Sequence, residues 1–147
     1  MVNPKRIGIA ADHAGYALKE LLKERLISEG YEVYDFGTDS GQSMDYPDTA
    51  HPLAISVERK ESEVGIILCG SGNGVNMTIN KHQGIRGALC WNAEIALLAR
   101  LHNDANIVAI PARFVSQEEA FEIVSIFLST DFEGGRHLNR INKIPCR

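Results

Sequence analysis

A cysteine followed by alternating glycines is the feature of this sequence with the clearest chemical use. Cys69 ends a continuous apolar segment and is followed by Gly70, Ser71, Gly72, Asn73 and Gly74 before a helical segment begins. Glycines in such a loop let the backbone approach a ligand closely and point several N–H groups at it, and the helix dipole adds positive potential. A thiol at this position is placed where its thiolate form is favoured. Cys69 is therefore a candidate base or nucleophile.

The glycine run admits other interpretations. A dinucleotide-binding loop reads GxGxxG, whereas this run reads GxGxG, follows the third predicted strand, and has no acidic residue at the end of the next strand. The Gly-Lys-Ser/Thr ending of a nucleotide-binding phosphate loop is missing. A tight turn without a ligand stays open, because glycine punctuates turns generally. Cys69 could also be a small buried hydrophobic residue, which is what we expect of Cys90.

Two histidines occur where a side chain could handle a proton or an anion. His13 follows Asp12, an expected helix N-cap, and is well placed to bind an anion or a hydroxyl group. Asp12 could cap the helix and bind a ligand as well. His102 lies at the expected carboxyl end of a helix, where the dipole favours the protonated imidazole and makes it a candidate acid. The histidines show neither HxH nor HExxH spacing, so we expect no metal site, and we expect His51 and His82 at the surface.

The charge of the chain favours a small anionic ligand. A formal net charge of −4 over 147 residues argues against nucleic acid as a partner. Residues 131–147 nevertheless gather five basic side chains: Arg136, His137, Arg140, Lys143 and Arg147. This basic tail could hold a small anion or be a solvated segment, and composition leaves both open.

The elements that position these residues are short apolar strands alternating with amphipathic helices. The predicted strands cover residues 6–11, 31–36, 64–69, 86–91 and 107–110. The predicted helices cover 14–29, 48–60, the segment from the glycine run to about 81, 93–101 and 117–128, the last opening with the capping box Ser116-x-x-Glu119. The pattern predicts one domain over 1–147, a three-layer α/β/α Rossmann-like fold with a largely parallel five-stranded sheet and an extended C-terminal tail. Strand order is not readable, but ligands of such sheets bind beyond the carboxyl ends of the strands.

Cysteine usage and hydropathy bear on location. The three cysteines are scattered and form neither a disulfide framework nor a CxxC motif, which favours a reducing cytoplasm. The first apolar run is too short for a secretory signal, and no segment approaches the roughly 18 apolar residues of a membrane span. We therefore expect a cytoplasmic protein without a membrane partner.

Over essentially its whole length the sequence resembles the RpiB/LacAB family of sugar-phosphate isomerases, specifically the type B ribose-5-phosphate isomerases. The matching motifs are ADHAG at 11–15, DYPD at 45–48, CGSGNG at 69–74, NK at 80–81, GIR at 84–86, RLHNDAN at 100–106 and EGGRH at 133–137. The resemblance implies an aldose–ketose isomerase acting through a cis-enediolate. Cys69 would be the base that removes the C2 proton of ribose 5-phosphate, His102 the acid that opens the furanose ring, and Ser71 an aid to proton movement between oxygens.

The resemblance also implies a substrate site, an assembly and an absence of cofactors. The implied substrate-binding residues are Asp12, His13, Tyr46, Gly70, Ser71, Gly72, Asn73, Gly74, Asn103, Arg113, Arg136 and Arg140. The family builds its sites between the subunits of a homodimer, and pairing of dimers stays open. Neither a metal nor an organic cofactor is implied.

Two alternative functions stay open. One is isomerisation of a six-carbon phosphate, such as allose 6-phosphate or galactose 6-phosphate, because Trp91 and Asn92 after the fourth strand could alter the rim of the site. Retention of Cys69 favours the ribose substrate, since the galactose-type subunits of the family lack a cysteine base there. The other is a sugar-phosphate-binding module without catalysis, which would bind its ligand equally well after Cys69→Ala.

Overall fold

A parallel sheet of five strands forms the centre of the chain, in the order β2-β1-β3-β5-β4. The computed structural model describes residues 3–146. Met1, Val2 and Arg147 lie outside the described residues, and of these Arg147 was counted in the basic tail. The strands are β1 (Arg6–Ala11), β2 (Glu32–Asp35), β3 (Val64–Cys69), β4 (Gly87–Leu89) and β5 (Ile107–Pro111). All four strand pairings are parallel, as predicted.

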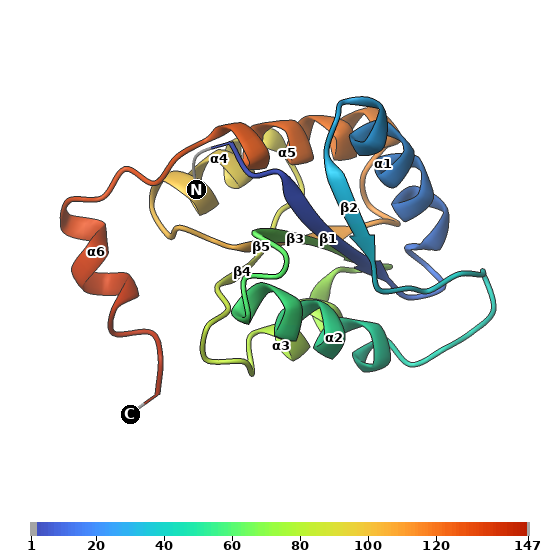
Figure 1. Ribbon diagram of the computed structural model, residues 1–147, viewed down its shortest axis with the longest axis horizontal. Helices are drawn as coiled ribbons and strands as arrows, with labels where there is room; N and C mark the ends of the chain where they lie inside the picture. The colour runs from blue at the N-terminus through green and yellow to red at the C-terminus, as the bar shows by residue number, and fades with distance from the viewer. Residues whose placement is uncertain (1–2, 147) are drawn as a thin grey trace.

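Helices cover both faces of this sheet (Figure 1). One face carries α1 (Tyr16–Ser28), α4 (Ala93–Leu101) and α5 (Gln117–Ser129), and the other carries α2 (Pro47–Glu58) and α3 (Asn73–Ile79). Every residue of β3 and β5 is buried, which explains why these strands are continuously apolar rather than alternating. The three-layer α/β/α prediction is confirmed.

The core consists of two apolar clusters separated by the sheet. Ile66 and Leu68 point to the cluster under α1, α4 and α5, together with Phe127, while Ile67 points to the cluster under α2 and α3, together with Leu53. This split follows from the two-residue side-chain period of a strand. It fixes the register of β3 and hence the position of Cys69 at its end.

The helix boundaries follow local capping chemistry. At the start of α5 the Ser116 backbone N–H donates to Glu119 Oε1 over 2.9 Å, and the Glu119 N–H donates to Ser116 Oγ over 3.1 Å. The predicted capping box is thus confirmed. By contrast, α1 begins at Tyr16 with Gly15 as its N-cap, so Asp12 is not the helix N-cap we expected.

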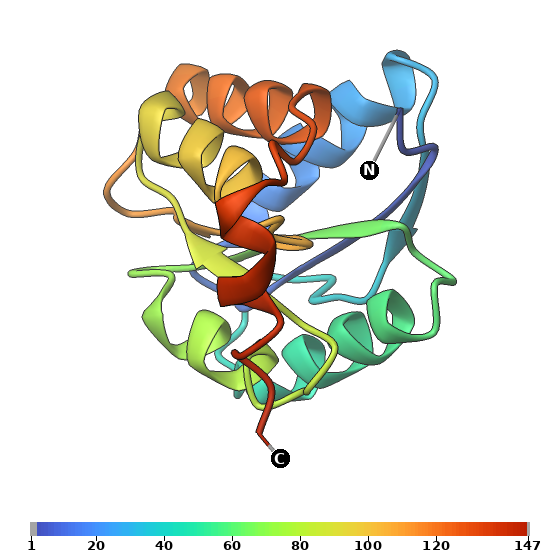
Figure 2. The same cartoon turned by 90° about the vertical axis from the view of Figure 1, so that its left-hand side faces the viewer.

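The C-terminal segment contains an element that the sequence pattern did not indicate. Residues 136–141 form a short helix, α6 (Arg136–Ile141), which follows Gly134 and Gly135 with φ of 74° and 61°. These left-handed conformations are readily open to glycine and let the chain turn sharply after α5. The helix lies at the left of Figure 1 and faces the viewer in Figure 2.

Two strands are shorter than predicted, β2 at 32–35 and β4 at 87–89. Arg86 falls outside β4, and its backbone N–H donates to Asn106 Oδ1 over 2.8 Å. No helix among residues 3–146 combines the length and apolar character needed to cross a membrane.

The crossovers between the strands determine in which direction the loops leave the sheet. The chain passes from β1 outward to β2 on one side, then returns across the sheet to β3 on the other side of β1. The loops after β1 and β3 therefore leave in opposite directions, which opens a crevice at the carboxyl ends of these strands. This is where the predicted Asp12 and Cys69 motifs lie.

Candidate functional site

Three predicted site residues meet at the carboxyl edge because their strands are neighbours. The backbone N–H of Asp12, after β1, donates to the Leu68 carbonyl of β3 over 3.2 Å. The N–H of Arg113, after β5, donates to the Gly70 carbonyl over 3.0 Å. Cys69 thus lies between the ends of β1 and β5, as the parallel order requires.

The thiol of Cys69 is held by the glycine loop directly after it. The residue is 5% exposed, and its Sγ accepts a hydrogen bond from the backbone N–H of Gly72 over 3.2 Å. Gly72 is the N-cap of α3 with φ of 75°, in the left-handed region. A Cβ there would collide with Leu89 Cδ1 and lie 3.2 Å from the Pro111 nitrogen. Glycine is therefore required for the loop to reach the sulfur.

Two other glycines of the loop make room for larger side chains. A Cβ at Gly70 would lie 3.0 Å from Nη1 of Arg113, and a Cβ at Gly74 would lie 2.5 Å from Cζ of Tyr46. Arg113 and Tyr46 therefore rest against the backbone of the loop. Both side chains are exposed.

Asp12 and His13 directly follow β1 at its carboxyl end. Asp12 is 7% exposed, and its Oδ1 accepts hydrogen bonds from the N–H groups of Ala14 at 2.9 Å and Gly15 at 3.1 Å. It stabilises the turn before α1. His13 Nδ1 accepts from the N–H of Met44 over 3.2 Å. A neutral ring then carries its proton on Nε2, which gives His13 a donor for an anion or hydroxyl group.

Ser71 and Asn73 complete this group on the exposed side of the loop. The N–H of Asn73 donates to Ser71 Oγ over 3.2 Å. They line an open hollow of about 540 Å³ whose rim includes Trp91 and Phe114, 51% and 74% exposed. A ligand beside the glycine run would meet these two aromatic rings.

The remaining predicted residues lie at the opposite edge of the sheet. Helix α4 starts after β4 and runs back along the sheet, so its C-cap, His102, lies near the amino ends of the strands. The carbonyl of Asn103 accepts from Nε of Arg86, just before β4, over 3.1 Å. The six residues of β3 separate the two edges by about 20 Å at roughly 3.3 Å per residue. One chain therefore does not bring His102 to Cys69.

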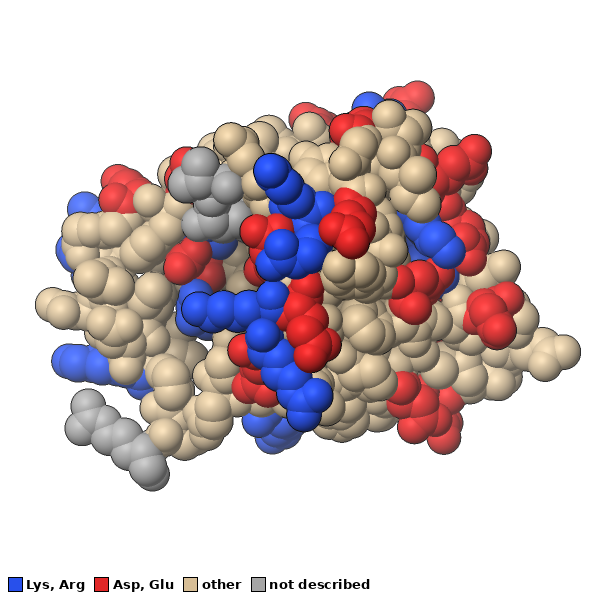
Figure 3. Space-filling model, viewed as in Figure 1, with Lys and Arg blue, Asp and Glu red and all other residues tan. Residues whose placement is uncertain are grey.

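Helix α6 lies beside His102, near the amino ends of the strands. We call His102, Asn103, Glu133, Arg136, His137 and Arg140 the amino-edge group. The N–H of Glu133 donates to the Leu101 carbonyl over 3.0 Å, which ties the start of the tail to the end of α4. Arg136 and Arg140 on α6 are exposed. Acidic and basic side chains interleave on the face drawn in Figure 3, so this view shows no single continuous basic field.

A stacked pair of histidines, which sequence reasoning missed, lies in the amino-edge group. The rings of His102 and His137 are 4.3 Å apart between centroids and inclined by 17°. Oε2 of Glu133 lies 3.6 Å from Nε2 of each histidine. Burial lowers the pKa of His137, and the neighbouring His102 and Arg136 lower it further. The spacing of His102 and His137 in the sequence matches no metal-binding motif, so motif rules could not find this pair. The direction of α4 is a usable signal, because a helix that runs back along the sheet brings residue 102 to the amino ends of the strands, where the tail begins.

A buried arginine, also missed, fixes the turn that carries His102 and Asn103. Arg100 is 1% exposed, and its Nη1 donates to Asp104 Oδ1 at 2.8 Å and to the Ala105 carbonyl at 2.6 Å. Its Nε donates to the Thr130 carbonyl over 2.9 Å, which links the turn to the end of α5. Charge-assisted hydrogen bonds of this kind are about twice as strong as neutral ones. Arg100 thus fixes the turn that follows α4 at Asp104 and Ala105.

The other cysteines and histidines behave largely as predicted. Burial raises the pKa of the Cys90 thiol to about 12, which agrees with a core residue. Cys146 is exposed. His51 is exposed, whereas His82 is half-buried: its Nε2 is hydrogen-bonded to Nδ1 of His51 at 2.7 Å.

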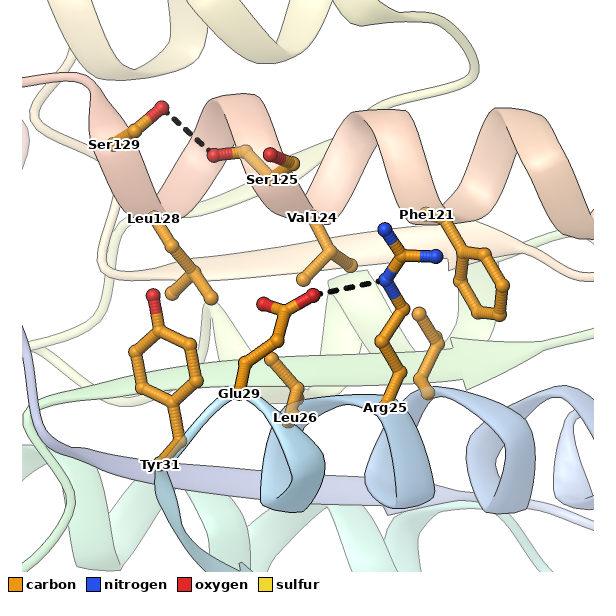
Figure 4. A pocket seen from close by; sticks show the side chains of 10 residues that line it. Arg25, Leu26, Glu29, Tyr31, Phe121, Val124, Ser125, Leu128 and Ser129 are labelled. Carbon is orange, nitrogen blue, oxygen red and sulfur yellow. Dashed lines mark hydrogen bonds and ion pairs between the residues drawn. The ribbon is translucent and has the colours of Figure 1, made fainter.

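A more enclosed pocket lies away from all these residues. It occupies about 100 Å³ between α1 and α5 and is lined by apolar side chains such as Leu26 and Leu128 and by polar ones such as Ser125 (Figure 4). At its mouth Arg25 Nε donates to Glu29 Oε1 over 2.9 Å. None of the predicted site residues lines it, so enclosure alone does not identify the functional site here.

Comparison with known proteins agrees with the fold and the motifs. The family model described as Ribose/Galactose Isomerase matches residues 7–144. Ribose-5-phosphate isomerase B of Escherichia coli strain K12 is 40% identical over 142 residues, which cover 97% of this chain and 95% of that protein.

Solved structures show the same relationship. A ribose 5-phosphate isomerase from Thermotoga maritima matches with a TM-score of 0.94 and 49% identity over 95% of this chain and 97% of that one. Ribose-5-phosphate isomerase B from Mycoplasma genitalium with bound ribulose-5-phosphate matches with a TM-score of 0.91 and 41% identity, over 95% of this chain and 93% of that one. The chain therefore belongs to the ribose/galactose isomerase family and is an isomerase.

Proposed function

We propose that the protein interconverts ribose 5-phosphate and ribulose 5-phosphate as a homodimer, with Cys69 as base and His102 as the acid that opens the ring. The observation that carries the proposal is the hydrogen bond from Gly72 to the Cys69 sulfur inside a loop built of glycines. The relatives named as ribose-5-phosphate isomerases, one of them with bound ribulose-5-phosphate, support the choice of substrate.

The isomerisation step uses the residues at the carboxyl ends of the strands, which we call the carboxyl-edge group: Asp12, His13, Cys69, the loop 70–74 and Arg113. The Cys69 thiolate takes the proton from C2 of the open-chain aldose, and the electron pair moves into a cis-enediolate. The thiol then returns a proton to C1, while a proton passes between the two oxygens with the help of Ser71. Backbone N–H groups of the loop stabilise the oxygen that becomes negative, and such a donor is worth about 3–4 kcal/mol when removed from other enzymes.

Ring opening uses the amino-edge group. The His102 imidazolium donates a proton to the ring oxygen while a water molecule accepts the proton of the C1 hydroxyl, which breaks the bond between C1 and the ring oxygen and frees the aldehyde. Glu133, whose carboxylate lies 3.6 Å from Nε2 of His102, can pair with the imidazolium. Asn103 then binds sugar hydroxyls, and the guanidinium groups of Arg136 and Arg140 bind the phosphate by bidentate hydrogen bonds.

A second chain unites the two groups. Because Cys69 and His102 lie at opposite edges of one sheet, a complete site requires the amino edge of one subunit to meet the carboxyl edge of its partner. Both edges carry exposed apolar side chains: Trp91 and Phe114 near the glycine loop, and Leu138 and Ile144 in the tail at 48% and 55% exposure. Apolar surface of this kind favours burial in an interface.

A coupled assay tests this function directly. Ribulose 5-phosphate formed from ribose 5-phosphate is measured in EDTA, with wild type and Cys69→Ala side by side. If wild type is active in EDTA and Cys69→Ala is not, the result supports the reaction, the role of the thiol as base and a mechanism that needs no metal. Because Trp91 and Asn92 border the site, allose 6-phosphate and galactose 6-phosphate are assayed in parallel, and a large preference for either overturns the ribose assignment. Cytoplasmic location and the absence of a cofactor stay predictions.

A further inference from the structure

The His102–Glu133–His137 cluster can do more than present an acid to the sugar. We propose that these three side chains bind a divalent transition-metal ion of the Zn²⁺ or Co²⁺ type. Each offers one ligand atom, and the three ligand atoms lie within 4.8 Å of one another. Two imidazoles and a carboxylate with a fourth position left for water are a common donor set for zinc.

The distances are close to those that a metal needs. Oε2 of Glu133 lies 3.6 Å from Nε2 of His102 and 3.6 Å from Nε2 of His137. Around a tetrahedral zinc with bonds of about 2.0–2.1 Å, neighbouring ligand atoms lie roughly 3.3 Å apart. The carboxylate therefore has to approach each nitrogen by only a few tenths of an ångström.

The second observation is an unsatisfied nitrogen. His137 is 6% exposed, and its buried Nε2 has no hydrogen-bond partner within residues 3–146. Buried polar atoms without a partner are rare and are commonly explained by a bound water or ion.

One ligand has to turn for the ion to bind. The two rings are inclined by only 17°, and because a ring nitrogen's lone pair lies in the ring plane, stacked rings cannot both point at one ion. The side chain of His102 is 38% exposed and that of Glu133 is 55% exposed, so both can rotate toward the fixed His137. Imidazole donors select zinc, cobalt or nickel over magnesium and calcium.

Binding has a consequence that rests on the proposed function. A metal ion would occupy the Nε2 lone pair of His102 and take this residue out of acid catalysis. The ion would then be an inhibitor of ring opening rather than a cofactor, and EDTA would reverse its effect.

The second histidine pair provides a matched control. His51 and His82 are hydrogen-bonded at 2.7 Å, but the other ring nitrogen of His82 is paired with Glu58 at 3.2 Å. Glu58 also accepts from the N–H of Gly84 over 2.9 Å, so this carboxylate is already engaged away from His51. The pair offers two donors to one ion instead of three.

Titration with Co²⁺ tests the site, because four-coordinate Co²⁺ has intense visible absorption bands. The background carries Cys146→Ser, since Cys146 is an exposed thiol. We expect one Co²⁺ per chain with tetrahedral bands, weakening of the affinity by about tenfold or more in Glu133→Gln, and no change in His51→Ala or Cys69→Ala. No saturable binding, equal affinity in Glu133→Gln, or loss in His51→Ala or Cys69→Ala would overturn the proposal.

A separate arm tests inhibition. Zn²⁺ is added to wild type and Glu133→Gln, and each rate is compared with that of the same protein in EDTA. We expect wild type to be inhibited at about tenfold lower Zn²⁺ than the variant, and equal sensitivity would overturn the link to His102. If no isomerase activity is found at all, the proposed function fails while the Co²⁺ titration still decides the metal site.

Discussion

The backbone N–H of Gly72 donates to the Sγ of Cys69 over 3.2 Å, so the glycine loop binds the sulfur as well as facing the ligand. By contrast, Cys90 lies in the core with its pKa raised to about 12 by burial. Its Sγ lies 3.7 Å from the Ala88 carbonyl, to which it donates. The two buried thiols therefore differ in their contacts, because one accepts a hydrogen bond from the glycine loop and the other donates one within the core.

Replacing Cys69 by alanine removes the residue that we propose as the base. We expect kcat on ribose 5-phosphate to fall by about 10²–10⁴-fold, the usual contribution of a general base, with KM nearly unchanged. Steady-state kinetics on Cys69→Ala measures both values. Cys90→Ala, a buried thiol outside the site, is the control. Undiminished turnover in Cys69→Ala would remove this residue from the mechanism.

His102→Ala separates ring opening from isomerisation. Because the acid acts on the cyclic sugar, we expect a loss of about 10²-fold or more with ribose 5-phosphate and a much smaller loss with an open-chain aldose phosphate. The comparison is made under single-turnover conditions with both substrates. An equal loss on the two substrates would contradict the assigned role.

Mixing two inactive variants tests whether the site spans two chains. Cys69→Ala and His102→Ala are unfolded together in equal amounts and refolded. If each site takes Cys69 from one subunit and His102 from its partner, half of the dimers are mixed and each has one intact site. We therefore expect about a quarter of the wild-type activity. No recovery, with dimer formation verified by light scattering, would show that Cys69 of one subunit and His102 of its partner do not form one site.

Gly72→Ala and Gly30→Ala form a matched pair. Both positions have positive φ, 75° and 94°, so each alanine costs about 1–2 kcal/mol of backbone strain. Nothing lies within 4 Å of a Cβ at Gly30, whereas a Cβ at Gly72 collides with Leu89. We expect Gly72→Ala to lose more free energy of unfolding in urea and also to lose kcat, with kcat retained in Gly30→Ala. Equal losses of unfolding free energy and of kcat in the two variants would mean that the glycine loop can shift away from Leu89 without harm to the site.

Acid should weaken the attachment of α1 to β2. Nζ of Lys19, which is fully buried, lies 2.7 Å from Oδ2 of Asp35. Burial alone would raise the pKa of Asp35, but hydrogen bonds from Lys19, the Gly37 N–H and Lys23 hold it below its ordinary value. A carboxyl with a lowered folded-state pKa contributes stability above its unfolded value and loses it as pH falls through the folded value.

Asp35→Asn should remove this acid dependence. We expect it to lower the free energy of unfolding at pH 7 by about 2–3 kcal/mol, since Lys19 stays buried and keeps only Glu20 at 3.2 Å as an ion-pair partner. The gap to wild type should shrink below about pH 4, as measured by urea unfolding at several pH values. Glu29→Gln, in an exposed pair with Arg25, is the control and should change stability by less than about 0.5 kcal/mol. A constant gap across pH would exclude Asp35 as the titrating group.

Hydropathy patterns predicted the three layers of the fold and the carboxyl-edge group. Such patterns describe neighbouring residues in the sequence, so they do not predict how distant segments pack. Cys69 and Asp12 could be placed together because both follow buried strands, and parallel strands end at one edge. The strand order was not predictable, since it depends on which crossovers the chain takes. The contact of Tyr46 with Gly74 also depends on that packing.

His102, Asn103, Arg136 and Arg140 were predicted as site residues, but the helix α6 and the contacts of His137 and Arg100 escaped prediction for a different reason. Residues 131–147 are polar with few apolar positions, so periodicity gave no sign of α6, and His137 was counted only as a basic residue of the tail. Its burial and its stacking on His102 arise from the sharp turn at Gly134 and Gly135. The role of Arg100 in the turn after α4 is equally invisible in a pattern of residue types, because its carbonyl partners are backbone atoms.

The placement of Cys69 and His102 at opposite edges of the sheet bears on how such a protein can evolve. After a gene duplication, one copy could lose the thiol and the other the imidazole while part of the activity is retained, provided that the two products pair. Each mixed dimer would retain one working site built from the surviving halves. Two separate genes would then be needed for one reaction, and neither product would be active when expressed alone.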